Sequence, residues 1–222
     1  MLTAEKTAFI KLMQDAGVLL FGDFTLKSGR QSPYFCNLGN FRTGQQLDFL
    51  GKAYAAQIHR FVGADFHALF GPAYKGIPLA AVTAAALYRE YGIDRPYCFD
   101  RKEAKDHGEG GKLVGYQPQD GDRLILTEDV ITAGTALREV LPVLQAQANV
   151  TVTDMFIAVD RMEKVGDTGK TAVQQVRDEF GIAVHACVTI ADIYDYLQAH
   201  GTDADLLKRM AHYRLQFTIE SL

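Results

Sequence analysis

Two adjacent carboxylates, Glu128 and Asp129, follow a short apolar run over residues 124–126. A run of this length is typical of a buried strand, and the acids fall where that strand would end. Carboxylates in such a place can accept hydrogen bonds from sugar hydroxyls or help to hold a divalent cation. The alternative, equally open at this point, is that they only cap or solvate the end of a strand.

A turn of small and hydroxyl-bearing residues comes next. It is formed by Thr132, Ala133, Gly134 and Thr135, and a helical pattern begins at Leu137. A strand that runs through such a turn into a helix presents free backbone N–H groups at the positive end of the helix dipole, which suits a phosphate. Without the acids, the same residues would indicate an ordinary turn. The stretch lacks the Gly-Lys-Ser/Thr ending of a Walker A loop.

A second loop with similar properties spans residues 71–76 and has the sequence Gly-Pro-Ala-Tyr-Lys-Gly. It follows a predicted strand over residues 67–70 and opens a predicted helix. A tight turn at a helix start can bind an anion through backbone N–H groups, and the Lys75 ammonium adds a positive charge. The alternative is a plain connection between strand and helix, with a solvated lysine.

A third stretch, residues 100–112, is polar, carries both signs of charge and has three glycines near its end. Such a segment cannot bury enough apolar surface to be firmly ordered, so it predicts a flexible loop. As a plain surface loop it would have no further role. As a lid, it would bring Arg101, Lys102, Lys105 and His107 onto a polyanion and keep water out once substrate binds.

These segments have to be positioned by an α/β framework. Apolar residues at helical spacing predict helices over residues 3–16, 45–62, 76–91, 133–145, 170–180 and 190–214. Apolar runs predict strands over residues 67–70, 97–99, 123–130, 155–159 and 184–189, and residues 21–40 have a β-rich pattern. The alternation predicts a central, mostly parallel sheet flanked by helices. All three loops would lie at the carboxyl ends of its strands, where ligands bind in such sheets.

We expect a single domain over residues 1–222, in which residues 1 to about 62 form a small N-terminal hood over a core of about 63–222. The chain of 222 residues is 48% apolar and 23% charged, as in ordinary soluble globular proteins. Its net charge of −4 argues against nucleic-acid binding, and its apolar runs stay well below the roughly 18 residues of a membrane span. Three widely spaced cysteines indicate neither a disulfide framework nor a zinc site. The N-terminus predicts an amphipathic helix rather than a signal peptide, so the expected location is cytoplasmic.

The acid pair and the turn after it, taken in this order, resemble the signature of the type I phosphoribosyltransferases. These enzymes bind 5-phosphoribosyl 1-diphosphate (PRPP), with the acids facing the ribose hydroxyls and the turn holding the 5-phosphate. Residues 27–30 and 32–35, the 71–76 loop, the lid segment and residues 128–135 are similar to the family members that act on orotate. The similarity extends from residue 9 to about residue 213, and the lid sequence is its most discriminating part.

The resemblance implies the type I phosphoribosyltransferase fold and a transfer of ribose 5-phosphate from PRPP to orotate, giving orotidine 5′-monophosphate and diphosphate in pyrimidine biosynthesis. The implied catalytic residues are Lys105, His107 and Asp129. The implied substrate-binding residues are Lys27, Phe35, Cys36, Tyr74, Lys75, Arg101, Lys102, Lys105, His107, Glu128, Asp129, Val130, Ile131, Thr132, Ala133, Gly134, Thr135, Ala136 and Arg161. The family also implies a cis peptide bond between Ala73 and Tyr74.

Two of the implied base contacts, Cys36 and Arg161, have alternative interpretations. Cys36 departs from the family, whose members often carry a second aromatic residue there, so we expect a backbone contact with the base in place of side-chain stacking. Arg161 would reach the base from the side opposite Phe35. Without the resemblance, an ion pair with Asp160 or Glu163 would be the preferred interpretation of Arg161.

The resemblance implies one cofactor and one partner chain. Mg²⁺ would be held mainly through PRPP oxygens, so no dedicated protein metal site is expected. The small-molecule partners are orotate and PRPP, with no nucleic acid and no membrane. The protein is expected to be a homodimer in which Arg101, Lys105 and His107 serve the neighbouring site and Lys102 serves its own.

Three alternative functions are weaker. A phosphoribosyltransferase for another base, such as a purine, is disfavoured by the lid and by the region of Lys27 and Phe35. A non-catalytic PRPP sensor that regulates transcription should add a DNA-binding module, which the short N-terminal region and the negative charge disfavour. An α/β protein without a catalytic lid would not explain why two anion loops, an acid pair and a basic segment all fall at one end of the sheet.

Overall fold

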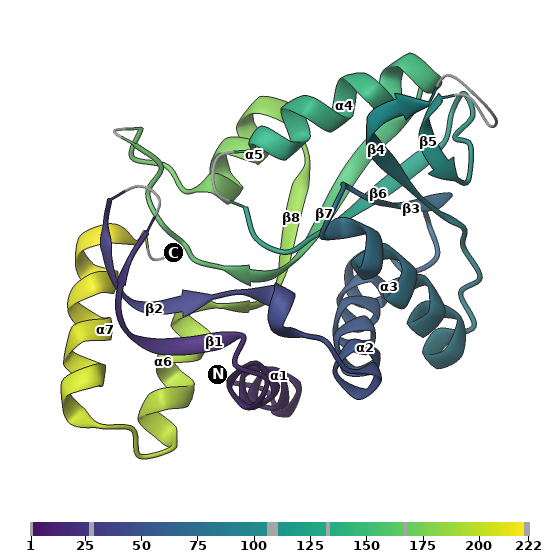
Figure 1. Ribbon diagram of the computed structural model, residues 1–222. Coiled ribbons are helices and arrows are strands. Elements are labelled where there is room, and N and C mark those ends of the chain that lie inside the picture. The colour runs from purple at the N-terminus through teal and green to yellow at the C-terminus, as the bar shows by residue number, and fades with distance from the viewer. Residues whose placement is uncertain (1, 27–28, 106–110, 132–133, 167, 220–222) are drawn as a thin grey trace.

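The computed structural model describes residues 2–26, 29–105, 111–131, 134–166 and 168–219. Its centre is a six-stranded sheet with the strand order β5-β4-β3-β6-β7-β8 (Figure 1). The strands are β3 (Ala68–Gly71), β4 (Tyr97–Lys105), β5 (Gly111–Gly115), β6 (Arg123–Glu128), β7 (Thr151–Asp160) and β8 (Ala183–Thr189). All neighbours pair in parallel except β4 and β5, which are antiparallel. The predicted α/β class with a mostly parallel sheet is confirmed.

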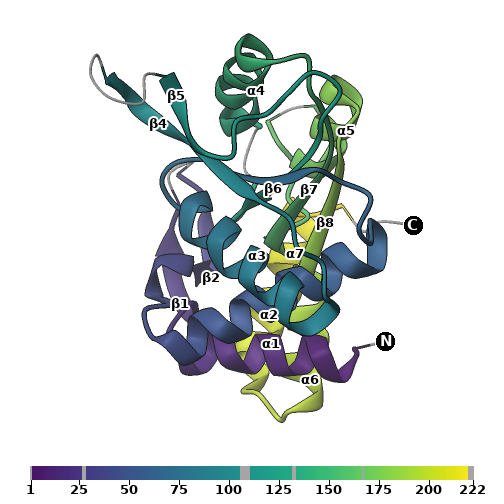
Figure 2. The ribbon, with the colours of Figure 1, turned by 90° about the vertical axis from the view of Figure 1, so that its right-hand side faces the viewer.

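Helices cover both faces of this sheet (Figure 2). One face carries α1 (Ala4–Asp15), α2 (Gly44–Phe61) and α3 (Gly76–Tyr91), and the other carries α4 (Thr135–Gln147) and α5 (Ala172–Phe180). The side chains of β3 show why: Leu69 joins the core under α2 and α3, whereas Ala68 and Phe70 join the core under α4 and α5. A strand buried on both faces needs a continuous apolar run, which is the pattern of its sequence.

The predicted boundary near residue 62 does not separate two packing units. Helix α2 lies in the same layer as α3 and contacts β7 and β8, because its apolar face, with Leu50, Tyr54 and Ile58, is buried there. The hood proper is the antiparallel pair β1 (Leu19–Thr25) and β2 (Gln31–Cys36), followed by the short 3-10 helix η1 (Leu38–Asn40).

The C-terminal helices complete the hood. The single helix predicted over residues 190–214 is two helices, α6 (Ile190–Ala199) and α7 (Ala204–Phe217), separated by a turn in which Gly201 has φ +69°. Strand β2 packs against α7, so a strand near the N-terminus and the last helix lie side by side (Figure 1).

The predicted lid segment differs from the expected loop. Residues 100–105 continue β4, and β5 begins at residue 111, with Asp100 opposite Leu113 in an antiparallel ladder. The expectation that residues 100–112 form one loop is therefore wrong for both flanks of the segment. Main-chain hydrogen bonds between β4 and β5 order these flanks, although their polar side chains bury little apolar surface. Residues 106–110 lie outside the described residues.

The two ends of the parallel strands carry different polar groups. At the amino ends, Asp154 pairs with Arg123 at 3.1 Å and with His185 at 2.8 Å. At the carboxyl ends, β3 leads into the 71–76 loop, β6 into the acid pair and β7 into Asp160. Within the described residues, every helix is too short or too polar to cross a lipid bilayer.

Candidate active site

The acid pair lies at the carboxyl end of β6, as predicted. Glu128 is the last residue of the strand, and its Oε1 accepts the N–H of Asp129 at 2.9 Å. Asp129 is buried, and its Oδ1 accepts the N–H of Val130 at 2.7 Å. The Tyr54 hydroxyl donates to the carbonyl of Glu128 at 2.7 Å, which ties α2 to this strand end. Both carboxylates are thus fixed by the backbone around them.

The second anion loop brings its lysine to the acid pair. Lys75 Nζ lies 2.6 Å from Asp129 Oδ2, although these residues are 54 positions apart in the chain. Three charges therefore converge where β3 and β6 end side by side. Any polyanion that takes Lys75 away from Asp129 would leave the carboxylate free to accept other donors.

Glu128 has an unusual protonation equilibrium. Burial raises its pKa from 4.5 to about 7, and the nearby charge of Asp129 acts in the same direction. The backbone N–H of Asp129 and the Lys75 ammonium act in the opposite direction. Near neutral pH the Glu128 carboxyl is therefore balanced between its neutral and charged forms, so that it can accept or donate a hydrogen bond.

The 71–76 loop is closed by contact between its two glycines. A Cβ on Gly71 would lie 2.1 Å from the carbonyl oxygen of Gly76, and a Cβ on Gly76 would lie 2.7 Å from the carbonyl carbon of Gly71. Only glycine fits at both positions. The expected cis bond between Ala73 and Tyr74 is confirmed. The N–H of Ala73 donates to Asp100 Oδ1 at 2.6 Å, so β4 holds the loop from the side.

Helix α4 starts at a glycine. Gly134 has φ +67° and occupies the N-cap position, where it offers no side chain to the first N–H groups of the helix. The predicted residues Thr135 and Ala136 begin α4. Val130 and Ile131 pack against the cores on opposite faces of the sheet, which anchors the chain between acids and helix. Thr132 and Ala133 lie outside the described residues.

The lid residues divide into described and undescribed ones. Arg101 and Lys102 lie on β4, and Lys102 Nζ pairs with Glu139 Oε2 of α4 at 3.1 Å. Lys105 ends β4, but its side chain lies outside the described part of the chain, as does the whole of His107. Strand β4 therefore lies beside α4. The two predicted catalytic groups of the lid, the side chains of Lys105 and His107, are outside the described part of the chain.

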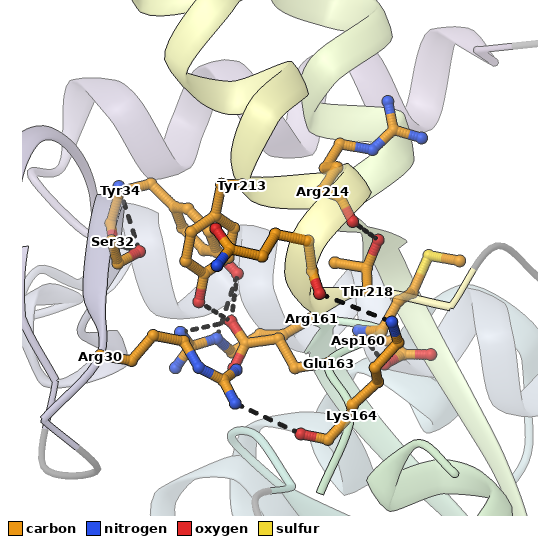
Figure 3. A network of polar contacts seen from close by, with 12 residues as sticks. Arg30, Ser32, Tyr34, Asp160, Arg161, Glu163, Lys164, Tyr213, Arg214 and Thr218 are labelled. Carbon is orange, nitrogen blue, oxygen red and sulfur yellow. Dashed lines mark hydrogen bonds and ion pairs between the residues drawn. The ribbon is translucent and has the colours of Figure 1, made fainter. Parts of the chain in front are cut away.

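The predicted base contacts lie at the hood. Phe35 is 39% exposed on β2 and stacks on Phe24 at 5.6 Å between ring centroids. Burial raises the pKa of the neighbouring Cys36 thiol to about 12, so the thiol is neutral. Arg161 Nη2 pairs with Glu163 Oε1 at 2.7 Å, which is the ion pair expected without the resemblance (Figure 3). Lys27 lies outside the described residues.

Three residues that shape the site were not predicted for this role: Tyr54, Asp100 and Glu163. Tyr54 and Asp100 act across long sequence separations, on Glu128 and Ala73. Glu163 contacts Arg161, two positions before it, and the distant Tyr34. Only Glu163 had a local signal, as a possible ion-pair partner two positions after Arg161. Within the described residues, no group of three or more His, Cys, Asp or Glu side chains could by itself hold a metal ion.

Comparison with known proteins identifies the class. A family model described as the phosphoribosyl transferase domain matches residues 38–190, which include both anion loops, the acid pair and β3 to β8. With the fold, this match makes the chain a phosphoribosyltransferase.

Individual relatives narrow the assignment. An orotate phosphoribosyltransferase of Lachnoclostridium phytofermentans is 48% identical over 192 residues, covering 86% of this chain and 85% of the relative. One of Vibrio cholerae is 47% identical over 216 residues, covering 97% and 99%. The crystal structure of the Francisella tularensis orotate phosphoribosyltransferase has a TM-score of 0.85 and 38% identity, covering 96% of this chain and all of that one. The chain belongs to the orotate phosphoribosyltransferase family, which confirms the predicted family and its pentosyltransferase class.

Proposed function

We propose that this chain binds PRPP and orotate at the carboxyl ends of β3, β6 and β7 and transfers ribose 5-phosphate to a ring nitrogen of orotate. The products are orotidine 5′-monophosphate and diphosphate. The observation that carries the proposal is the convergence of Lys75 with the acid pair between two helix starts. PRPP carries a phosphate at one end and a diphosphate at the other, which fits one helix N-terminus each.

The two ends of PRPP are assigned to the two loops. The N-terminus of α4, with Gly134, Thr135 and Ala136, binds the 5-phosphate, and the 71–76 loop binds the diphosphate. Lys75 then moves from Asp129 to the diphosphate, and Asp129 and Glu128 accept hydrogen bonds from the ribose hydroxyls. Asp129 and Lys75 form an ion pair in the free protein. When PRPP binds, the carboxylate turns to hydroxyl donors and the ammonium to phosphate oxygens.

The reaction breaks the bond between the ribosyl carbon and the diphosphate oxygen, and the diphosphate leaves with the electron pair. The orotate ring nitrogen forms the new bond to that carbon, and the proton of this nitrogen is released to solvent. Lys75, Arg101, Lys102, Lys105 and His107 stabilise the charge that grows on this leaving group. Mg²⁺ supplies further neutralisation of the diphosphate when it is bound through PRPP. The Glu128 and Asp129 carboxylates are oxygen donors of the type that Mg²⁺ accepts, so they fit this role directly or through water.

The base lies between the hood and the loop after β7. Phe35 stacks on the orotate ring, the backbone at Cys36 and the side chain of Lys27 contact it from the hood, and Thr132 and Arg161 approach from the other side. The protein acts as a homodimer in which Arg101, Lys105 and His107 complete the neighbouring site and Lys102 completes its own. The proposal includes a cytoplasmic location, which suits three cysteines that are free in the structure.

The first test is a spectrophotometric assay of the purified protein with orotate, PRPP and Mg²⁺, which follows the loss of orotate absorbance. Parallel reactions contain uracil or adenine. We expect turnover with orotate alone and a loss of turnover when Mg²⁺ is chelated. Turnover with adenine would assign a different base, and tight PRPP binding without turnover of any base would favour the sensor function.

A further inference from the structure

The Glu163 carboxylate lies where three parts of the chain meet (Figure 3). Its Oε1 accepts hydrogen bonds from the hydroxyls of Tyr213 at 2.6 Å and Tyr34 at 3.1 Å. Its Oε2 accepts from Arg30 Nη1 at 3.2 Å, and Arg161 Nη2 lies 2.7 Å from Oε1. The three hydrogen-bond donors and the ion-pair partner come from α7, from β2, from the residue before β2 and from the loop after β7. One carboxylate therefore joins the hood to the sheet.

Glu163 controls the direction of the Arg161 side chain. The Arg161 side chain is only 18% exposed, and a guanidinium group so deeply buried needs a compensating charge. Glu163 supplies that charge on Nη2, and the Tyr34 hydroxyl accepts from Nε at 3.1 Å. The guanidinium also lies over the Tyr34 ring, 5.2 Å from its centroid. With Glu163 neutral, the ring and one hydroxyl would remain, but the charged partner that fixes Nη2 would be lost.

Glu163 also anchors the strand that presents Phe35. Successive side chains of a strand point to opposite faces, and on β2 Tyr34 is fully buried whereas Phe35 is 39% exposed. The Tyr34 hydroxyl is tied to Glu163, and Arg30 at the start of the same strand is tied to Glu163 and to the carbonyl of Lys164. The position of Phe35 relative to Arg161 therefore depends on one shared carboxylate.

We infer that Glu163 is a positioning residue for the base site, which sets Arg161 and Phe35 at a fixed separation before orotate binds. The inference rests on the proposed function, in which these two side chains contact orotate. Glu163 itself touches neither substrate. Its loss should weaken the use of orotate and leave the use of PRPP unchanged, because the acid pair and the 71–76 loop are held by other contacts.

The test compares steady-state kinetics of the unmutated protein with Glu163→Gln, which keeps the side-chain shape and one acceptor oxygen. We expect the KM for orotate to rise about tenfold, with the KM for PRPP and kcat within about twofold. Tyr34→Phe, which keeps the ring and removes only the hydroxyl, should raise the KM for orotate by about threefold and gives a second readout if Glu163→Gln folds poorly. In an Arg161→Ala background, Glu163→Gln should have little further effect on the KM for orotate, because the two residues act as a unit.

The matched control is Asp154→Asn, which removes another buried, ion-paired carboxylate at the amino ends of the strands. It should lower the melting temperature without changing the ratio of the two KM values. A Glu163→Gln protein that behaves like this control would overturn the inference and reduce Glu163 to a structural role. A lower KM for orotate would also overturn it, because Glu163 would then compete with the substrate for Arg161. Absence of turnover by the unmutated protein would overturn the proposed function, and the inference with it.

Discussion

Glu128 is the residue whose chemistry depends most on its surroundings. Burial keeps its pKa near 7, so the folded protein holds a proton that the unfolded chain releases above pH 4.5. The unfolding free energy therefore falls as pH rises from about 4.5 to about 7, and this loss persists at higher pH. A difference of that size corresponds to about 3 kcal/mol at most. In the proposed function this cost in stability is retained because the Glu128 carboxyl binds the ribose hydroxyls.

Replacement of Glu128 by glutamine tests this account. At pH 8, Glu128→Gln should be more stable than the unmutated protein in urea unfolding, whereas at pH 5 the two should be alike. Turnover should fall at both pH values. Glu179→Gln, at an exposed ion pair with Arg138, is the control and should leave the pH dependence of stability between pH 5 and pH 8 unchanged. Parallel stability profiles for Glu128→Gln and the unmutated protein would contradict the buried-carboxyl explanation.

Replacement of Lys105 should lower the catalytic rate. In the proposed function Lys105 stabilises the leaving diphosphate, and loss of one such donor typically costs about a hundredfold in rate. Lys105→Ala should lower kcat by about that factor with little change in melting temperature. Lys208→Ala on α7, an exposed lysine away from the strand ends, should leave kcat unchanged. Equal kinetics for the two variants would remove Lys105 from the mechanism.

At the scale of elements, the close contact between α2 and α3 holds the layer that supports β6. A Cβ on Gly51 of α2 would lie 2.5 Å from the carbonyl oxygen of Val82 in α3, so only glycine permits this approach. The same α2 carries Tyr54, whose hydroxyl reaches the carbonyl of Glu128. The fit of one helix against another therefore sets the position of the acid pair.

Two glycines of α2, Gly51 and Gly44, have different surroundings and should respond differently to substitution by alanine. Gly51→Ala should lower the unfolding free energy by about 1–3 kcal/mol, because overpacking outweighs the gain in helix propensity. Gly44→Ala, at the start of α2 where an added Cβ meets nothing within 4 Å, should be neutral or slightly stabilising. Urea unfolding of both variants makes the comparison. A stabilised Gly51→Ala protein would mean that α2 and α3 can move apart freely.

For the whole molecule, polar groups are distributed unequally between the two ends of the sheet. At the amino ends, Arg123, Asp154 and His185 satisfy one another. At the carboxyl ends, the starts of α3 and α4 have no side-chain cap among the described residues, and Lys75 is half exposed. In the proposed function, this asymmetry directs PRPP and orotate to the carboxyl ends of the strands.

The proposed homodimer predicts that two inactive variants restore each other. Lys105→Ala and Asp129→Asn should each be nearly inactive alone, and mixed under conditions of subunit exchange they should regain up to about a quarter of the full activity. Half of the random dimers would then contain both variants, and each would have one intact site. Exchange is verified by native mass spectrometry of the mixture. No recovery in a mixture that has exchanged would show that the lid serves its own subunit.

The sequence by itself predicted the alternation of strands and helices, and the family comparison confirmed the enzyme class. Apolar periodicity is local, so β3, β6 and the helices after them were placed to within a few residues. Two boundaries failed for the same reason: β4 continued into a polar segment, and α2 joined the core layer rather than the hood. Both depend on which distant backbone or surface each segment meets, and periodicity carries no information about that.

The placement of Glu128, Asp129 and Lys75 at one edge of the sheet could be predicted from the expected strand ends, because parallel strands bring their carboxyl ends to one edge. The contact of Lys75 with Asp129, the support of Ala73 by Asp100 and the convergence of four side chains on Glu163 were decided only by the tertiary structure. Hydrogen bonds and ion pairs need atoms within about 3 Å. That condition is met between residues far apart in the chain only after the sheet and its layers have formed, because packing fixes which side chains face one another.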